Sequence, residues 1–472
     1  MNYKSITYYL SYFCFPVSLL SFVNILYSLY FDHFLNTNLY VLVLILSAAI
    51  GVLFFFIGRK SNKKLTFFEK LTLVILTYLL TSIFFSIPYY FSNYQIVLID
   101  SFFESISGLT LTGFSVFENI KYFDPTLILW RSSSQWVGGL YFLIFLLLVF
   151  SDKQYDYKLI SLSATPNINL SSEENLKKRI IYISSVYIIL TFLIFMLLNF
   201  SNIRLFNSLN LSMTLISNGG FLPSNSLDLI IKTFFDKIIL SISLLISLIN
   251  IFILLNIFNF KKLINENQED FLIISLTLLI TLILITTLNN PDNLNILIGV
   301  LSSLSNSGIS VGNIPENINL YFLFLTIIGG SIISNSSGIK FLRFYILIKS
   351  SVFEITKLVR PNHIMSQSFL YSKKVFSSQQ INNSFLIFIS FFISILILSS
   401  LLITDNINFE DSFKISVLTL TNTSYSNLFG STEIYFSNLL TSSKLSILFF
   451  MIIGKIELIS LFLLIKNLIF KN

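Results

Sequence analysis

The sequence predicts an all-α integral membrane protein, in which four pseudo-symmetric units of helix, re-entrant loop and helix follow a two-helix extension. Three observations support this fold class. Only 11% of the residues are charged and 54% are hydrophobic, whereas soluble domains carry about 25% charged residues. Long apolar segments recur along the whole chain. Between them, a short stretch rich in Thr, Ser, Asn and Gly recurs four times, which is typical of an internally repeated architecture.

Ten apolar segments are long enough to cross a bilayer, which requires about 20 residues in a helix. The first is preceded by Lys4 and resembles a cleaved signal, but no small-residue cleavage site follows its long apolar core, so we expect it to remain as an anchor. The segments cover roughly residues 8–30, 39–58, 71–91, 127–150, 180–200, 229–259, 269–289, 319–348, 380–404 and 441–469.

Basic residues concentrate in alternate loops, which predicts that these loops and both chain termini are cytoplasmic. This distribution also explains the net charge of +7 without a nucleic-acid partner. Lys121, Arg204 and Lys414 are exceptions to the pattern. The basic loops contain Arg59, Lys60, Lys63, Lys64 and Lys70, then Lys153, Lys158, Lys177, Lys178 and Arg179, then Lys261 and Lys262, and finally Lys349, Lys357, Arg360, Lys373 and Lys374.

The stretch DSFFESISGLTLTGFSV, residues 100–116, defines the repeated design as a short helix followed by an extended segment. Three later stretches have the same layout, and we align positions 113, 219, 308 and 424. The predicted units are a two-span extension (1–65) and four repeats (66–160, 161–264, 265–360 and 361–472). The extended segments contain Thr110, Leu111, Thr112 and Gly113; Ser217, Asn218 and Gly219; Asn306, Ser307 and Gly308; and Asn422, Thr423 and Ser424.

Each short helix is expected to begin at a capping residue near the outer surface: Asp100 or Ser101, Asn207 or Ser208, Asp292 or Asn293, and Asp411 or Ser412. The partially negative helix C-termini then point toward a common centre. Non-helical backbone at membrane depth is tolerated only where it lines a wet cavity or is buried in protein. The four segments therefore predict a central pore whose carbonyl oxygens replace the water shell of a monovalent cation.

Charged residues inside the membrane indicate function. Lys455 and Glu457 lie within the last span, two residues apart and so on different helix faces, and Lys340 is expected to snorkel to the cytoplasmic interface. Arg131 is expected to anchor the first short helix. Four carboxylates, those of Asp100, Glu104, Glu410 and Asp411, are candidates for attracting cations at the outer mouth, although capping is expected to be the main role of Asp100 and Asp411.

No catalytic constellation is visible, so we do not expect an enzyme. The two histidines, His33 and His363, are far apart, which disfavours a metal site. Cys14 is the only cysteine and excludes an intrachain disulfide.

Six motifs resemble the Trk/Ktr/HKT potassium transporter superfamily, with the TrkH/TrkG potassium-uptake membrane subunit as the most similar branch. They are SGLTLTGFSV, LWRSSSQWVGGL (129–140), SNGGF (217–221), SNSGISVG (305–312), GGSIISNSSGIKFLR (329–343) and MIIGKIEL (451–458). The resemblance implies potassium uptake across the inner membrane and filter glycines at Gly113, Gly219 and Gly308. It implies no cofactor in this chain, only a K⁺ ion bound in the filter. It also implies a homodimer and a TrkA-like cytoplasmic nucleotide-binding ring.

The polar run from Gly329 to Gly338 interrupts the eighth span. The resemblance implies that it is a gate loop containing Gly329, Gly330, Ser334, Asn335 and Gly338, with Lys455 facing the pore below the filter and holding the loop's carbonyls. A helix kink is the alternative interpretation. Ile333 and Ser337 replace family glycines here, which predicts a stiffer loop.

Ser424 stands where the family has a fourth filter glycine. If its side chain faces the pore axis, we expect weaker discrimination between K⁺ and Na⁺; if the side chain turns away, the serine is simply tolerated. Two further function classes stay open. One is a carrier coupled to H⁺ or Na⁺ (symport), although the same-side repeats differ from the inverted repeats of most carriers. The other is a non-conducting scaffold.

Overall fold

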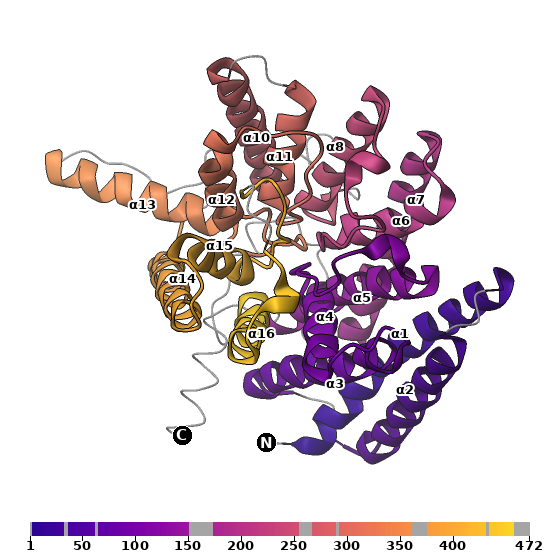
Figure 1. The fold of residues 1–472 in the computed structure, drawn as a ribbon. Coiled ribbons are helices and arrows are strands. Elements are labelled where there is room, and N and C mark those ends of the chain that lie inside the picture. The colour runs from indigo at the N-terminus through magenta and orange to yellow at the C-terminus, as the bar shows by residue number, and fades with distance from the viewer. Residues whose placement is uncertain are drawn as a thin grey trace.

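The computed structural model describes residues 2–32, 36–61, 65–150, 173–253, 267–288, 292–360, 375–430 and 434–456. Four helix–loop–helix units follow one another around a common centre, and a two-helix extension lies outside them (Figure 1). The extension consists of α1 (Tyr3–Tyr30) and α2 (Thr37–Gly58). Gly51 and Gly58 of α2 lie directly against Cys14 and Tyr8 of α1, because small residues allow two membrane helices to approach closely.

The same elements recur in each unit: an outer helix, a short central helix, a 3₁₀ turn and an inner helix. The expected boundaries between the units stay a prediction. The elements are α3 (Phe67–Phe91), α4 (Leu98–Thr110), η1 (Ile120–Tyr122) and α5 (Pro125–Phe150); α6 (Glu173–Phe200), α7 (Leu205–Ser217), η4 (Leu227–Leu229) and α8 (Phe234–Leu248); α10 (Gln268–Thr287), α11 (Asn293–Ser305), η6 (Glu316–Ile318), α12 (Asn319–Ile328) and α13 (Phe341–Val359); and α14 (Ser378–Thr404), α15 (Phe409–Leu420), η7 (Phe436–Asn438) and α16 (Thr441–Ile456).

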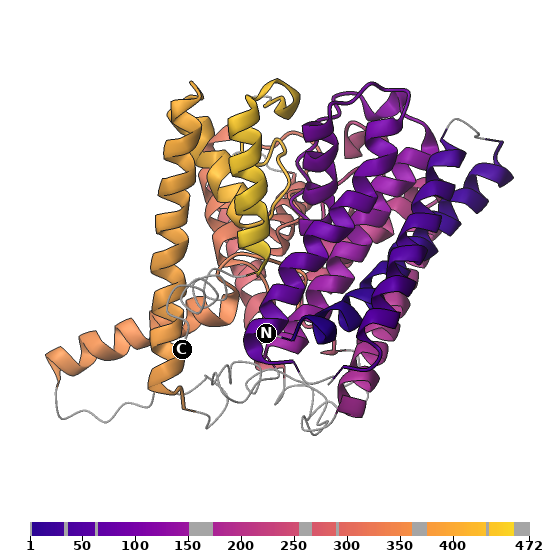
Figure 2. The same ribbon diagram turned by 90° about the horizontal axis from the view of Figure 1, so that it is seen from below.

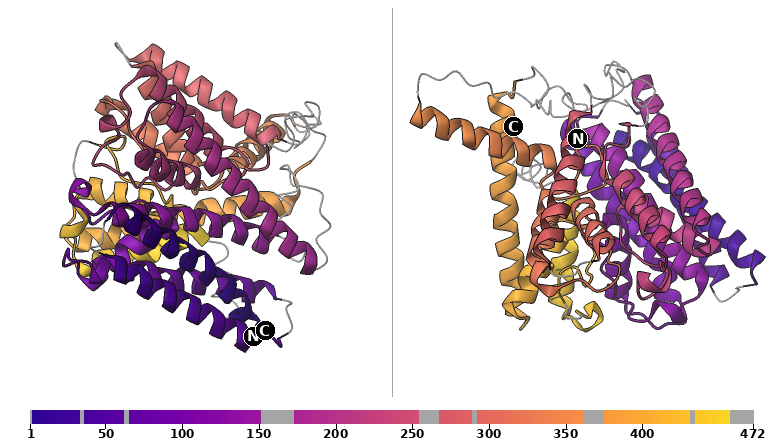
Figure 3. Two further views of the ribbon diagram at one scale, coloured as in Figure 1. Left: turned by 90° about the vertical axis from the view of Figure 1, so that its right-hand side faces the viewer. Right: turned by 90° about the horizontal axis from the view of Figure 1, so that it is seen from above.

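Six helices in the described part of the chain are long and apolar enough to cross a membrane: α1, α2, α3, residues 180–200 of α6, α10 and α14. The expected eighth span, 319–348, is not one helix. It divides into α12 and α13, which are separated by the non-helical residues 329–340, so the interpretation as a simple kink is wrong. The helix α13 runs across the direction of α14 and projects from the bundle (Figures 2 and 3). The last expected span is described to Ile456, and its remainder lies outside the described residues.

The expected N-cap position is confirmed for Asp292 of α11 and is wrong for the other three short helices. The N-cap residues of the four are Val97, Arg204, Asp292 and Asn408, and none of these side chains makes a capping hydrogen bond. Capping boxes instead begin three of the longer helices: Thr66 with Glu69 in α3, Thr233 with Asp236 in α8, and Ser377 with Gln380 in α14. A reciprocal side-chain cap satisfies two helix N–H groups at once, so the spans themselves carry the strong start signals.

Candidate filter and intramembrane loop

Three of the short central helices, α4, α7 and α11, end in a residue with left-handed backbone, and in α15 the left-handed residue follows one position later. These residues are Leu111, Asn218, Asn306 and Asn422, with φ of 68°, 61°, 64° and 47°. The N–H of the following residue then donates to a carbonyl five residues earlier, over 2.9–3.0 Å in all four copies. This hydrogen bond satisfies a carbonyl at the helix end and turns the chain away from the helix axis. The four copies are therefore structurally equivalent, and we call the residues at and just beyond the end of each short helix the filter segments: 110–113, 217–220, 305–308 and 421–424.

The equivalence corrects the alignment in the second copy by one residue. The glycine that matches Gly113 (φ 72°) and Gly308 (φ 64°) is Gly220 (φ 74°). Gly219 instead matches Thr112, because the N–H groups of both residues make the five-residue hydrogen bond. The sequence SNGGF offers two adjacent glycines, and only the backbone geometry distinguishes them.

The four filter segments meet at one place. A methyl group added to Gly113 would collide with the carbonyl oxygen of Gly219 and with the side chain of Ser424. A methyl group on Gly308 would collide with the carbonyl oxygen of Ser424. Side chains are excluded here because backbone from different repeats approaches too closely, and glycine also permits the positive φ without strain.

Asparagine amides connect the filter segments to one another and to the inner helices. Asn306 donates to the Thr423 hydroxyl (3.1 Å) and to the Thr326 carbonyl (2.8 Å). Asn422 donates to the Thr112 hydroxyl (3.0 Å) and to a carbonyl of α16 (2.9 Å). Asn218 donates to a carbonyl of α8 (3.3 Å). The sequence signal for this bracing was the recurrence of Asn at one position of three copies.

Gln135 of α5 was missed as an individual residue, although it lies within one of the quoted motifs. Its amide Nε2 donates to the Gly219 carbonyl over 2.5 Å, and its Oε1 accepts the N–H of Phe221 over 3.1 Å. The side chain thus clamps the second filter segment from both directions.

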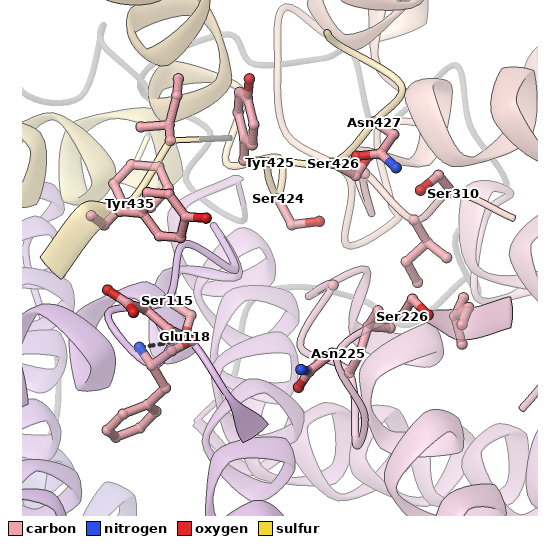
Figure 4. A pocket seen from close by; sticks show the side chains of 18 of the residues that line it. Ser115, Glu118, Asn225, Ser226, Ser310, Ser424, Tyr425, Ser426, Asn427 and Tyr435 are labelled. Carbon is pink, nitrogen blue, oxygen red and sulfur yellow. Dashed lines mark hydrogen bonds between the residues drawn. The ribbon is translucent and has the colours of Figure 1, made fainter. Parts of the chain in front are cut away.

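Ser424 directs its side chain toward the other filter segments. Its hydroxyl donates to the Ser307 carbonyl over 2.5 Å. A methyl group on either Gly220 or Gly308 would collide with this hydroxyl. Figure 4 shows the Ser424 side chain extending into the space between the repeats. The alternative in which the serine turns away from the centre is therefore wrong.

A cavity of about 520 Å³ opens directly above the filter segments, and all four repeats line it. We call it the outer vestibule. Its described lining contains two carboxylates, Glu118 and Asp228, and no Lys or Arg. Glu118 accepts a hydrogen bond from the Ser437 hydroxyl, and Asp228 accepts one from the Gly312 N–H, each over 2.7 Å. Carboxylates at a narrow mouth raise the local concentration of cations.

The carboxylates expected to attract cations at this mouth occupy other sites. Asp100 pairs with Lys444 over 2.6 Å, and Glu410 pairs with Lys414 over 2.6 Å. The fully buried Glu104 pairs with Arg131. Asp411 lies in the first turn of α15 and does not line the vestibule. The basic partners of Asp100 and Glu104 come from other helices, and the partner of Glu410 comes from the next turn of its own helix.

Asp292, at the start of α11, also has a basic partner. Lys237 of α8 donates to its carboxylate over 2.7 Å. This hydrogen bond and the positive charge lower the pKa of Asp292 below its ordinary value.

Arg131 anchors α4, as expected from the sequence. Its Nε lies 2.7 Å from Glu104, and its Nη2 donates to the Ser115 hydroxyl over 3.0 Å. Glu104 in turn accepts the Val116 N–H over 3.0 Å. The guanidinium also lies 4.2 Å from the centre of the Phe221 ring. One buried ion pair thus joins α4, α5 and the two chains that leave the first and second filter segments.

Residues 329–340, here called the intramembrane loop, lie beneath the filter segments. Gly329 and Gly338 have φ of 70° and 73°, which lets the chain leave α12 and return to α13. The Asn335 amide donates to the Ile216 carbonyl at the end of α7 over 2.9 Å. The Ser337 N–H donates to Asn306 Oδ1 over 3.0 Å. The loop is therefore hydrogen-bonded to the third filter segment and to the end of the helix that precedes the second.

Two buried lysines hold the loop. Lys455 donates to the Asn335 carbonyl (3.0 Å) and the Ser337 hydroxyl (3.1 Å), as the resemblance implied. Lys340 was expected to reach the cytoplasmic interface, but it is 2% exposed. Its ammonium donates to the carbonyls of Ser331, Ser334 and Ser336. The loop's own carbonyls stabilise the buried charge, which is why the side chain does not snorkel. Glu457 lies outside the described residues.

Within the described residues, no group of three or more His, Cys, Asp or Glu side chains could hold a metal ion. His33 and His363 lie outside that part of the chain. Cys14 is a free, buried thiol.

The comparisons with known proteins agree with this geometry. The family model named TrkH, described as a cation transport protein, matches residues 294–469. An uncharacterised cation transporter of Methanocaldococcus jannaschii is 27% identical over 333 residues, which cover 69% of this chain and 68% of that protein. The Trk system potassium uptake protein TrkG of Escherichia coli is 21% identical over 451 residues, 89% of this chain and 90% of its own.

The crystal structure of the potassium transporter TrkH from Vibrio parahaemolyticus has the same fold. It matches with a TM-score of 0.86 at 20% sequence identity, and the match covers 98% of both chains. This likeness confirms the predicted all-helical membrane fold.

Proposed function

We propose that this chain is a distant member of the TrkH cation transport family, that the cation it transports is K⁺ and that the direction is uptake into the cell. K⁺ enters the outer vestibule, passes the four filter segments and reaches the cytoplasm when the intramembrane loop moves. The observation that carries this proposal is the meeting of four structurally equivalent segments at one place, where glycines exclude side chains.

The filter segments are the proposed ion-binding site. Backbone carbonyls replace the water that K⁺ loses, and the negative ends of the four short helices point toward the same region. The proposed ligating residues are Thr110, Leu111, Thr112 and Gly113; Ser217, Asn218, Gly219 and Gly220; Asn306, Ser307 and Gly308; and Asn422, Thr423 and Ser424.

The membrane potential alone supplies enough energy for accumulation. One elementary charge gains about 2.3 kcal/mol per 100 mV, so roughly −150 mV concentrates K⁺ several-hundred-fold. Coupling to H⁺ or Na⁺ is not required by this mechanism.

Reduced discrimination against Na⁺ is the second candidate, and the orientation of Ser424 favours it. The Ser424 hydroxyl donates a hydrogen bond to the Ser307 carbonyl. The carbonyl oxygen is therefore shared between this hydroxyl and any ion in the filter. A hydroxyl at this level also adds an oxygen ligand that can follow the smaller Na⁺ ion inward. Weaker selectivity than in a filter with four glycines follows from both effects.

The intramembrane loop is the proposed gate. Gly329, Gly330, Ser334, Asn335 and Gly338 form the movable part, and Lys455 holds it under the filter. Ser337 supplies a hydroxyl to Lys455 in place of a family glycine, and this additional bond supports a stiffer loop.

We also propose that the protein resides in the inner membrane with both termini cytoplasmic, as a homodimer regulated by a TrkA-like nucleotide-binding ring. The basic loops and the resemblance support this arrangement. Co-purification with such a ring protein and mass determination of the detergent-solubilised assembly test it.

Flux of radioactive Rb⁺ into proteoliposomes, driven by a set membrane potential and competed with K⁺ or Na⁺, tests the transport proposal. We expect uptake that follows the potential and is competed more strongly by K⁺ than by Na⁺. Uptake that requires a H⁺ or Na⁺ gradient would instead identify a coupled carrier. Absence of uptake by folded protein, together with failure to rescue potassium-uptake-deficient cells, would identify a non-conducting scaffold.

A further inference from the structure

Glu269 is a buried carboxylate that the transport proposal does not use. It lies in the first turn of α10 and is 2% exposed. Its Oε1 accepts the backbone N–H of Ile332, in the middle of the intramembrane loop, over 2.9 Å. A buried hydrogen bond is costly to break without a replacement partner, so this contact ties the loop to α10.

The neighbouring residue makes an equivalent contact with a different element. Asp270 is 1% exposed, and its Oδ1 accepts the N–H of Asn250, just beyond the end of α8, over 2.8 Å. The backbone after α8 also pairs with the loop. The Ser331 N–H donates to the Leu248 carbonyl and the Ile251 N–H donates to the Ile333 carbonyl, both over 3.2 Å. The start of α10, the end of α8 and the loop therefore form one hydrogen-bonded unit.

Two buried side chains hold the loop by its backbone, Lys340 through carbonyl oxygens and Glu269 through an N–H group. The Lys340 ammonium, at the start of α13, binds carbonyls of the loop, whereas Glu269 binds an N–H. The loop is thus restrained from α10 as well as from α13 and α16.

We propose that Glu269 is a positioning residue of the gate: it fixes the closed intramembrane loop to the cytoplasmic end of α10 through the Ile332 N–H. A displacement of α10 at this end then moves the loop away from the filter. This role rests on the proposed gating function of the loop and extends it to a third helix.

The first repeat provides a matched control. Glu69 is also a buried carboxylate in the first turn of an outer helix, here α3. Its oxygens accept the N–H groups of Thr66 (2.9 Å) and Asn2 (2.5 Å), and neither belongs to the loop. A general effect of removing a buried helix-start carboxylate will therefore appear in Glu69→Ala as well as in Glu269→Ala.

The experiment measures loop position without relying on ion flow. In a Cys14→Ala background, which removes the only native cysteine, Ile333→Cys places a thiol at a loop position that is 1% exposed. Inside-out vesicles are treated with a membrane-impermeant methanethiosulfonate reagent, and the labelling rate is compared among the parent, Glu269→Ala, Glu269→Gln and Glu69→Ala. Potential-driven Rb⁺ flux is recorded for the same proteins.

We expect Glu269→Ala to raise the labelling rate roughly tenfold, because the hydrogen bond that ties Ile332 to α10 is lost. Glu269→Gln retains an acceptor and is expected to give a smaller rise, and Glu69→Ala is expected to match the parent. Where Rb⁺ flux is present, it should rise in parallel with an unchanged Rb⁺/Na⁺ ratio.

Unchanged labelling in a monodisperse Glu269→Ala protein, or an equal rise in Glu69→Ala, would overturn the inference even if the parent conducts Rb⁺. Increased labelling confined to the Glu269 variants, in proteins that conduct no Rb⁺, would support the positioning role while refuting the transport proposal.

Discussion

Replacing Ser424 by glycine tests how the fourth filter segment affects ion selectivity. Ser424 has no positive φ, whereas Gly113, Gly220 and Gly308 have φ between 64° and 74°. The substitution removes the hydroxyl that donates to the Ser307 carbonyl. It also permits the fourth segment to adopt the backbone of the other three. The expected result is a more symmetric filter in which that carbonyl is free to contact K⁺.

The size of the effect follows from the hydrogen bond that is lost. A neutral hydrogen bond contributes about 0.5–1.5 kcal/mol net, and a K⁺ ion that recovers the Ser307 carbonyl gains an interaction of similar size. Since about 1.4 kcal/mol corresponds to tenfold, we expect the K⁺/Na⁺ preference to rise roughly twofold to tenfold. The change should appear in the ion competition rather than in protein stability.

The assay is Rb⁺ uptake into proteoliposomes, with K⁺ and Na⁺ titrated as competitors of both proteins. Ser310→Gly is the matched control, because Ser310 lines the vestibule two residues beyond Gly308 and its removal leaves the filter segments intact. The reasoning is refuted if Ser424→Gly has the parental K⁺/Na⁺ ratio, or if Ser310→Gly changes the ratio equally.

Three further substitutions test other parts of the pathway. Gly113→Ala places a methyl group against the neighbouring filter segments at a positive φ. We expect at least tenfold lower Rb⁺ flux and a destabilisation of about 1–3 kcal/mol, measured by thermal unfolding in detergent. Parental flux would contradict the close approach of the filter segments. Arg131→Met leaves the carboxylate of Glu104 buried without its partner, which should lower the free energy of unfolding by about 3–5 kcal/mol. Adding Glu104→Gln should recover part of that loss. Simple additivity of the two losses would argue against an interaction between the two residues. The double substitution Glu118→Gln and Asp228→Asn removes the two described carboxylates of the vestibule. Rb⁺ flux should fall at low ionic strength and approach the parental value near 1 M salt, where the screening length is about 3 Å. A loss of flux that does not depend on salt would exclude an electrostatic role.

Much of the architecture was predictable from the sequence because it depends on local composition. A bilayer requires long apolar segments, and their spacing indicated all of the outer helices now described. Glycines at Gly113 and Gly308 and the Arg131 anchor were also predictable, since positive backbone angles and buried charges restrict the residue types that fit. The polar run after Gly329 likewise indicated a break in the eighth span, because such a run is poorly suited to a lipid-facing helix.

Only the tertiary structure decided which groups meet. It assigned Gly220 rather than Gly219 to the filter register, because two adjacent glycines look identical until the backbone turns. It directed the Ser424 hydroxyl toward the Ser307 carbonyl, and it turned the Lys340 ammonium toward carbonyls of the intramembrane loop instead of to the interface. Partners of Asp100 and Glu104 lie 344 and 27 residues away. The sequence shows which residues are charged, but whether a charged side chain has a partner depends on distant segments that only folding places beside it.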